Sequence, residues 1–217
     1  MTAPPDQKLE RDAPGSGKAM DRVVAFSDGI FAFAITLLVV SLDVPDIPAR
    51  LAGSELVPAL VAQAPRFASY AFSFWMVAIY WMAHHRMFQY IERYDGTLLG
   101  LNFLMLFAVG FLPYPVELLG RYGDLPAAEA FYAGSMALVG FASAGVWAYA
   151  ARRRLIGADT PEDVINHFTW RALSAPSVFV LSAFIAFVSV PAAYLALFLI
   201  AVIQGRLRRR FASAGVR

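Results

Sequence analysis

One apolar stretch constrains this chain more than any other: residues 22–40, which read RVVAFSDGIFAFAITLLVV. Its length and apolar character are typical of a helix that crosses a hydrocarbon core about 30 Å thick. The stretch nevertheless carries Arg22, Ser27 and Asp28 near its start. A carboxylate inside a bilayer costs on the order of 3 kcal/mol on insertion scales, so Asp28 needs a partner or water. Arg22 and Asp28 are separated by about 240° around a helix, so we expect Asp28 to meet a group from another helix.

Beyond this polar turn, apolar residues recur at spacings of three and four. They are Ile30, Phe33, Leu37 and Val40, with Thr36 beside them. The spacing predicts an apolar stripe with one hydroxyl on one face of the helix. On the pattern alone, such a stripe indicates a packing seam more often than a pore.

The composition supports a membrane protein. The 217 residues are 59% hydrophobic and 16% charged, whereas a soluble domain is about 45–50% apolar and about 25% charged. The chain has no Cys, which excludes disulfides, thiolate metal sites and cysteine nucleophiles. A net charge of +2 gives no indication of nucleic acid as a partner. We therefore expect the lipid bilayer to be the main surroundings of this chain.

Hydropathy predicts an all-α integral membrane protein with a single repeat of six transmembrane helices. The predicted spans are residues 22–44, 67–84, 97–112, 126–151, 168–190 and 191–206. A disordered cytosolic arm (residues 1–21) precedes this domain, which covers residues 22–206, and a basic cytosolic tail (residues 207–217) follows it. We also expect a short helix near residues 55–61 in the first outer loop, and a continuation of the second helix as far as Tyr94.

Proline and glycine add two local expectations. Pro113 and Pro115 follow the third span and predict that it kinks or ends there. Gly134, Gly140 and Gly145 lie in the fourth span, where residues without a side chain let helices approach closely.

The positive charges predict the orientation. Arg50, Arg66 and Arg121 fall on one side of the six spans, and the other fifteen of the 18 Lys and Arg residues fall on the opposite side. Since Lys and Arg accumulate in cytoplasmic loops, both termini are predicted to be cytosolic.

His84 and His85 are the remaining residues that could bind a metal. Adjacent side chains diverge by about 100° on a helix, whereas two ligands on one face require a spacing of four residues. We therefore predict no metal site and no cofactor, and a structural His84 bonded to Asp28, Ser27 or Asn102. The sequence contains no nucleophile–base set, so no catalytic residue is assigned and an enzyme is not expected.

Three motifs in order resemble one known family. They are Arg22-x-x-x-Phe26-Ser27-Asp28, the segment WMAHHRMF at residues 81–88, and residues 101–115, which begin Leu-Asn and end Phe-Leu-Pro-Tyr-Pro. Together they are similar to the transmembrane protein 175 family: potassium-permeable channels of animal endosomes and lysosomes, with single-repeat relatives in bacteria and archaea. The resemblance covers residues 22–119.

The resemblance implies a homotetrameric, potassium-permeable channel whose central pore is lined by the first helix of each subunit. It assigns three apolar constriction layers to Phe33, Leu37 and Val40, and the threonine associated with potassium preference to Thr36. The periodic stripe adds Ile30 to the predicted pore lining. The first layer is usually Ile or Leu in the family, so Phe33 is a departure that affects the conductance and selectivity to be expected.

The resemblance also implies a structural network that holds the pore helix in place and is not itself the filter. Its candidates here are Arg22, Phe26, Ser27, Asp28, Trp81, His84 and Asn102. The implied location is the plasma membrane of a prokaryote, with potassium as the permeant ion.

Two other functions stay open at this stage. In a small proton-coupled transporter, Asp28 and His84 would form a proton relay inside each subunit. Such carriers often contain inverted repeats with broken helices, and no such repeat is found here. The third possibility is a non-conducting membrane assembly factor.

Overall fold

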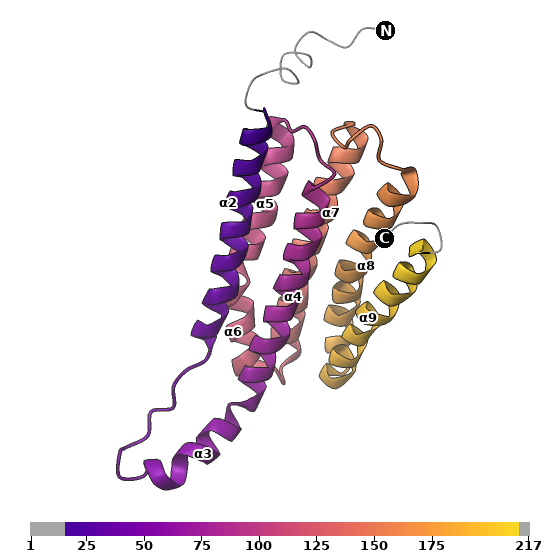
Figure 1. Cartoon of the computed structure of the whole chain (residues 1–217). Helices are drawn as coiled ribbons and strands as arrows, with labels where there is room; N and C mark the ends of the chain where they lie inside the picture. The colour runs from indigo at the N-terminus through magenta and orange to yellow at the C-terminus, as the bar shows by residue number, and fades with distance from the viewer. Residues whose placement is uncertain (1–15, 213–217) are drawn as a thin grey trace, which may run out of the picture.

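The structure, a computed structural model of the chain, describes residues 16–212, and all the regular elements of this part are helices (Figure 1). In chain order they are α2 (Ser16–Leu37), the 3-10 helix η1 (Leu38–Ser41), α3 (Ala52–Ala62), α4 (Ala64–Phe88), α5 (Gly96–Phe111), α6 (Pro113–Tyr122), α7 (Pro126–Arg152), α8 (Glu162–Ala186) and α9 (Val190–Ala212). The predicted all-α membrane fold is confirmed.

Six segments run along the bundle, as predicted. Five are long and apolar enough to cross a membrane: residues 19–41, 96–122, 126–152, 162–186 and 190–207. The sixth is α4, which has 25 residues and contacts α2, α6 and α7. Its Tyr, Trp and His side chains lower its hydropathy while still packing inside the bundle.

The third span is made of two helices that meet at Leu112. The backbone N–H of Leu112 donates to the Val109 carbonyl at 3.1 Å, so the last turn of α5 tightens before Pro113 opens α6. The ring of Pro113 cannot continue the hydrogen-bond ladder, which explains the predicted break.

Several predicted boundaries are displaced. Helix α2 begins at Ser16, so the predicted arm of residues 1–21 overlaps its first six residues; residues 1–15 lie outside the described part. Helix α9 continues to Ala212, into the predicted tail, whose residues 213–217 also lie outside it. The predicted continuation of the second helix to Tyr94 is wrong, because α4 ends at Phe88. The short outer helix is confirmed as α3, which buries none of its residues and extends away from the bundle (Figure 1).

Helix α7 is the centre of the bundle. It contacts five other helices, α4, α5, α6, α8 and α9. In its most apolar 18 residues 56% are buried, compared with 22% in α2. A helix that is apolar on all sides packs at the centre of a bundle, whereas one with a single buried face packs at the edge. Helices α8 and α9 cover the side of α7 that faces away from α2 (Figure 1).

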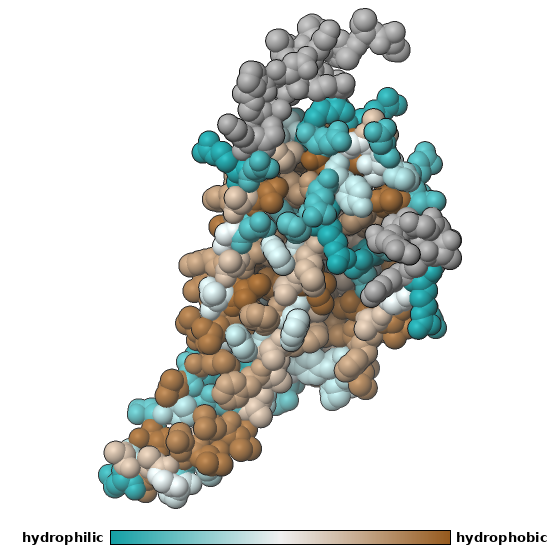
Figure 2. Space-filling model, in the orientation of Figure 1, coloured by the Kyte–Doolittle hydropathy of each residue, from teal (hydrophilic) through white to brown (hydrophobic). Residues whose placement is uncertain are grey.

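Polar residues collect at one end of the molecule. Figure 2 shows hydrophilic side chains where α2 begins and α7 ends, and hydrophobic side chains over the middle of the bundle and over α3. An exposed apolar surface along the bundle, next to a polar end, is the surface expected of a protein that spans a bilayer.

Candidate functional site at the pore helix

A polar cluster, partly or fully buried, joins the middle of α2 to α4 and α5. We call its five members, Ser27, Asp28, Trp81, His84 and Asn102, the polar brace. Ser27 is fully buried, and its hydroxyl donates to the Val23 carbonyl at 2.8 Å. The same oxygen accepts a hydrogen bond from Asn102 Nδ2 at 3.0 Å. This pair of bonds joins α2 to α5.

His84 continues the chain from α4. Its Nε2 lies 3.0 Å from Asn102 Oδ1, and its ring packs against Phe31 and Phe88 at centroid distances of 5.5 and 4.4 Å. An amide oxygen can only accept, so Nε2 carries the hydrogen. The buried Nδ1 has no hydrogen-bond partner within residues 16–212. A neutral imidazole with its hydrogen on Nε2 satisfies this geometry. Of the three partners predicted for His84, the structure shows Asn102.

Asp28 meets a different partner on α4. Trp81 Nε1 donates to Asp28 Oδ1 at 2.8 Å, so the acid is bonded by another helix, as its position on α2 predicted. In the described part of the chain no hydrogen bond or ion pair joins Asp28 to His84. Asp28 and His84 are thus bonded to different partners, Trp81 and Asn102.

Arg22 and Phe26 lie outside the brace. Phe26 is half-exposed and contacts Phe103 of α5 edge-on at 5.7 Å. Arg22 is exposed and forms no ion pair with any residue the structure describes. Of the predicted network, five members meet in space and these two do not. The sequence reasoning missed Phe31 and Phe88, although each lies four residues beyond a brace residue (Ser27 and His84), a spacing that predicts contact on a helix.

The predicted pore stripe lies on the uncovered face of α2. Phe33 is 59% exposed and Val40 is 70% exposed, while Thr36 is also exposed. Ile30 and Leu37 are partly buried. The opposite face of the helix is fully buried through Phe31, Ala34 and Leu38. One face of α2 thus packs into its own subunit and the other remains open.

Two details of the stripe differ from a simple α-helix. Helix α2 ends at Leu37, so Val40 lies in the 3-10 helix η1, where each residue turns the chain by about 120°. The Thr36 hydroxyl donates to the Phe33 carbonyl at 2.9 Å. Its hydrogen is therefore used within the helix, and its lone pairs remain available on the open face.

An ionic cluster holds the chain just after α2 and η1. Asp43 accepts from Arg66 at 2.7 Å and from Arg121 at 3.4 Å, and Arg121 also pairs with Glu117 at 2.7 Å. The cluster joins the chain after η1 to the start of α4 and the end of α6. Sequence reasoning placed both arginines on one side of the membrane but did not identify their shared carboxylate.

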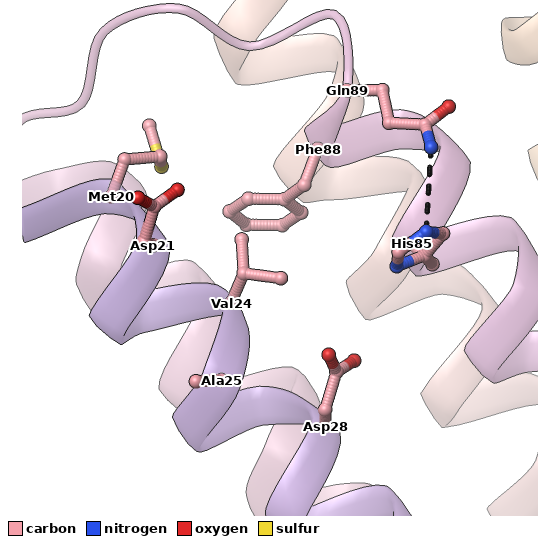
Figure 3. Close-up of a pocket in the computed structure, with 8 residues that line it drawn as sticks. All are labelled: Met20, Asp21, Val24, Ala25, Asp28, His85, Phe88 and Gln89. Atoms are coloured by element: carbon pink, nitrogen blue, oxygen red, sulfur yellow. Dashed lines mark hydrogen bonds between the residues drawn. The ribbon is translucent and has the colours of Figure 1, made fainter. Parts of the chain in front are cut away.

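A pocket of about 420 Å³ opens between α2 and α4 beside the brace. Its lining residues are Met20, Asp21, Val24, Ala25, Asp28, His85, Phe88 and Gln89. In Figure 3, Phe88 lies between the two helices, and Asp21 and Asp28 come from α2 about two turns apart, with Val24 and Ala25 between them. Across residues 16–212 no three His, Cys, Asp or Glu side chains converge as metal ligands.

Comparison with known proteins places this architecture among channels. Residues 22–113 match the family model for the endosomal/lysosomal potassium channel TMEM175. A potassium channel of Chamaesiphon minutus is 31% identical over 173 residues, which cover 78% of this chain and 85% of that protein. A potassium channel of Streptomyces collinus is 44% identical over 101 residues, and this match spans only about half of each chain, 46% and 48%.

A solved structure supports the same fold. The crystal structure of a TMEM175 homolog from Chamaesiphon minutus, described as a lysosomal potassium-selective channel homolog, superposes with a TM-score of 0.76. The superposition covers 88% of this chain and 98% of that chain at 28% identity.

Proposed function

The chain belongs to the TMEM175 family, and from this we propose that it forms a potassium-permeable cation channel, a homotetramer with its central pore lined by α2. One observation carries the proposal: α2 buries one face within its own subunit and leaves the face with the constriction residues open. A channel formed by several subunits requires such an open apolar face on α2, because the pore lies between the subunits.

In this channel the constriction consists of Phe33, Leu37 and Val40 from each subunit, and Ile30 lines the pore on the cytosolic side of the constriction. An ion that enters an apolar ring must shed water without receiving oxygen ligands in return, so such a ring closes by dewetting. A ring of Phe33 side chains is bulkier than the usual Ile or Leu, and its aromatic faces can also attract a cation.

Thr36 supplies oxygen within the apolar stretch. Because its hydroxyl hydrogen is bonded to the Phe33 carbonyl, its lone pairs can face a permeating cation. We propose that this oxygen underlies a preference for potassium. The polar brace holds the middle of α2, and the Asp43 cluster holds the chain just after η1, so side-chain bonds within one subunit fix this segment at two places.

We place the channel in the plasma membrane of a prokaryote with both termini in the cytosol. The positive charge supports this orientation, since Arg66 and Arg121 meet at the end opposite Arg152, Arg153 and Arg154 (Figure 1). The brace then lies toward the cytosolic side and the Asp43 cluster toward the outer side.

The function is tested by potassium flux from liposomes that contain the purified protein, driven by a potassium gradient, with sodium as the control ion and valinomycin to define complete release. We expect rapid potassium flux with no coupled substrate. No flux, or flux only against an opposing proton gradient, would contradict the channel and favour a carrier.

The constriction is tested with Phe33→Ala. Removing the ring widens the narrowest apolar layer, so we expect leak flux several-fold above that of the unmodified protein. Phe184→Ala is the matched control, because Phe184 on α8 is 72% exposed and loses the same side chain away from α2. Equal flux from both variants would exclude Phe33 from the gate.

A further inference from the structure

Glu129 is a fully buried acid in α7, outside the polar brace and the predicted pore stripe. It is the one carboxylate that is fully buried in the part of the chain the structure describes. No salt bridge there includes it. A buried ionised carboxylate without a cation is very costly, so the hydrogen bonds around Glu129 decide its protonation state.

Those bonds form a chain of three oxygen atoms across three helices. Glu129 Oε1 lies 3.0 Å from Ser182 Oγ on α8, and Ser182 Oγ lies 3.0 Å from the Ala193 carbonyl on α9. A serine hydroxyl has one hydrogen and the carbonyl has none. Two contacts between oxygen atoms therefore require a second hydrogen, which Ser182 cannot supply.

A protonated Glu129 supplies it. The acid then donates through Oε1 to Ser182, and Ser182 donates to Ala193. If Glu129 were ionised, Ser182 could satisfy only one of the two oxygen atoms, and the other contact would be repulsive. Glu129 Oε2, moreover, has no partner within residues 16–212. A neutral carbonyl oxygen without a partner is far less costly to bury than a charged one.

Within residues 16–212, neither tyrosine near Glu129 is hydrogen-bonded to it, and no cation is paired with it. Tyr194 on α9 uses its hydroxyl hydrogen on the Gly123 carbonyl at 2.9 Å. Tyr132, on α7 itself, is bonded to Ser73 of α4 at 3.1 Å.

The charged residues of the surrounding elements are occupied or distant. Arg121 of α6 is paired with Asp43 and Glu117. The titratable groups of α8 lie in its first turns, at Arg171 or before, three turns from Ser182. Asp124, in the loop before α7, would add further negative charge near Tyr194.

We propose that Glu129 is a proton-binding site, in which a single bound proton connects α7, α8 and α9 through Ser182 and the Ala193 carbonyl. The site lies one turn into α7, near the end of the molecule that carries α3, so the proton exchanges with water on that side. Release of the proton leaves a charge between the helices and removes a bond that holds α8 and α9 together. The site does not depend on ion conduction.

Infrared difference spectra of the full chain in liposomes test whether the proton is present. At neutral pH the unmodified protein should show the C=O stretching band of a protonated carboxylic acid, shifted in heavy water, and Glu129→Gln should lack it. Glu55→Gln is the matched control, because Glu55 is an exposed acid on α3 and should leave the band unchanged. A neutral-pH spectrum without the band, or a band that persists in Glu129→Gln, would overturn the site.

Thermal unfolding as a function of pH tests the connection between helices. A Glu side chain in an unfolded chain has a pKa of about 4.3. If the folded protein holds the Glu129 proton more tightly, the resulting stabilisation of the folded state is fully present below that pH. This contribution is lost as the pH rises until the folded protein also releases the proton. The unmodified protein should therefore lose thermal stability toward alkaline pH, and Glu129→Gln, whose amide donates without titrating, should lose less.

Ser182→Ala keeps the proposal testable if the Gln variant fails to fold. Without the serine acceptor, the Glu129 acid band should persist and move to a higher frequency, since its O–H is no longer hydrogen-bonded. An unmoved band would overturn the chain of bonds, as would an identical pH dependence in the unmodified protein and Glu129→Gln.

Discussion

At the scale of single residues, the position of one hydrogen settles the state of its neighbours. Ser27 donates its only hydroxyl hydrogen to Val23, so it must accept from the next group, which is Asn102 Nδ2. This fixes the Asn102 amide with its oxygen toward His84, and so places the hydrogen of His84 on Nε2. The packing of α2 against α4 and α5 thus depends on a histidine that donates through Nε2.

Asn102→Ala tests this chain of bonds. The substitution leaves the buried Nε2–H of His84 without an acceptor and removes the donor to Ser27. An unsatisfied buried group costs about 1–3 kcal/mol, so we expect the free energy of unfolding of the purified protein to fall by about that amount.

Gln89→Ala is the control for this measurement. Gln89 is an exposed amide that contacts His85 at 3.3 Å, and surface substitutions usually change stability by less than about 0.5 kcal/mol. Similar losses in both variants would mean that Asn102 does not stabilise the packing of α2.

At the scale of helices, local patterns predicted the number and kind of elements better than their ends. Helix α4 has no proline or glycine near Phe88 that would stop it. It ends there because the chain that follows pairs with the loop between α7 and α8: Gly157 donates to the Tyr90 carbonyl and Glu92 donates to Leu155. These contacts join residues more than sixty positions apart, so no local pattern could reveal them.

The same limit applies to the candidate site. Asp28 was predicted to meet another helix from its angular position alone, and it does. The fully buried Glu129 was not identified, since an acid near the start of a helix is ordinarily a favourable surface charge. Its burial follows from the way α8 and α9 close over α7, which depends on packing between distant segments.

Of the three predicted glycines of α7, only Gly140 lies at a close contact with another helix of the same subunit. A side chain on Gly140 would approach the ring of Pro176 on α8 to within 2.8 Å, whereas side chains on Gly134 and Gly145 would meet nothing within 4 Å. The predicted close approach is confirmed for Gly140 and is wrong for the other two within the subunit.

Gly140→Ala should therefore destabilise the protein by about 1–3 kcal/mol through overpacking, because a rigid proline ring and two helix backbones must move apart. Gly145→Ala is the matched control. A helical Ala is favoured over Gly by roughly 0.5–1 kcal/mol where space is free, so this variant should keep or raise the unfolding midpoint. The two variants should shift the unfolding midpoint in opposite directions. Equal midpoints would mean that the contact with Pro176 does not explain the glycine at position 140.

At the scale of the whole molecule, charge and fold agree on two distinct ends. Arg50, Arg66 and Arg121 lie at the end that carries α3, and the loop with Arg152, Arg153 and Arg154 lies at the opposite end (Figure 1). The apolar band lies between them (Figure 2). A bilayer sorts such a molecule by its Lys and Arg, so the orientation is a property of the entire chain.

The absence of cysteine in the natural sequence makes this orientation directly measurable, since any variant with one introduced Cys carries a single thiol. We choose Ser54→Cys on α3 and Ala158→Cys in the loop between α7 and α8, both at exposed positions. A maleimide that cannot cross membranes should label Ser54→Cys in intact cells and Ala158→Cys only after the cells are permeabilised. The reverse pattern would put both termini outside and the polar brace near the outer surface. Labelling of both variants in intact cells would contradict a single orientation, and with it a pore in which every subunit presents the same end of α2 to the same side.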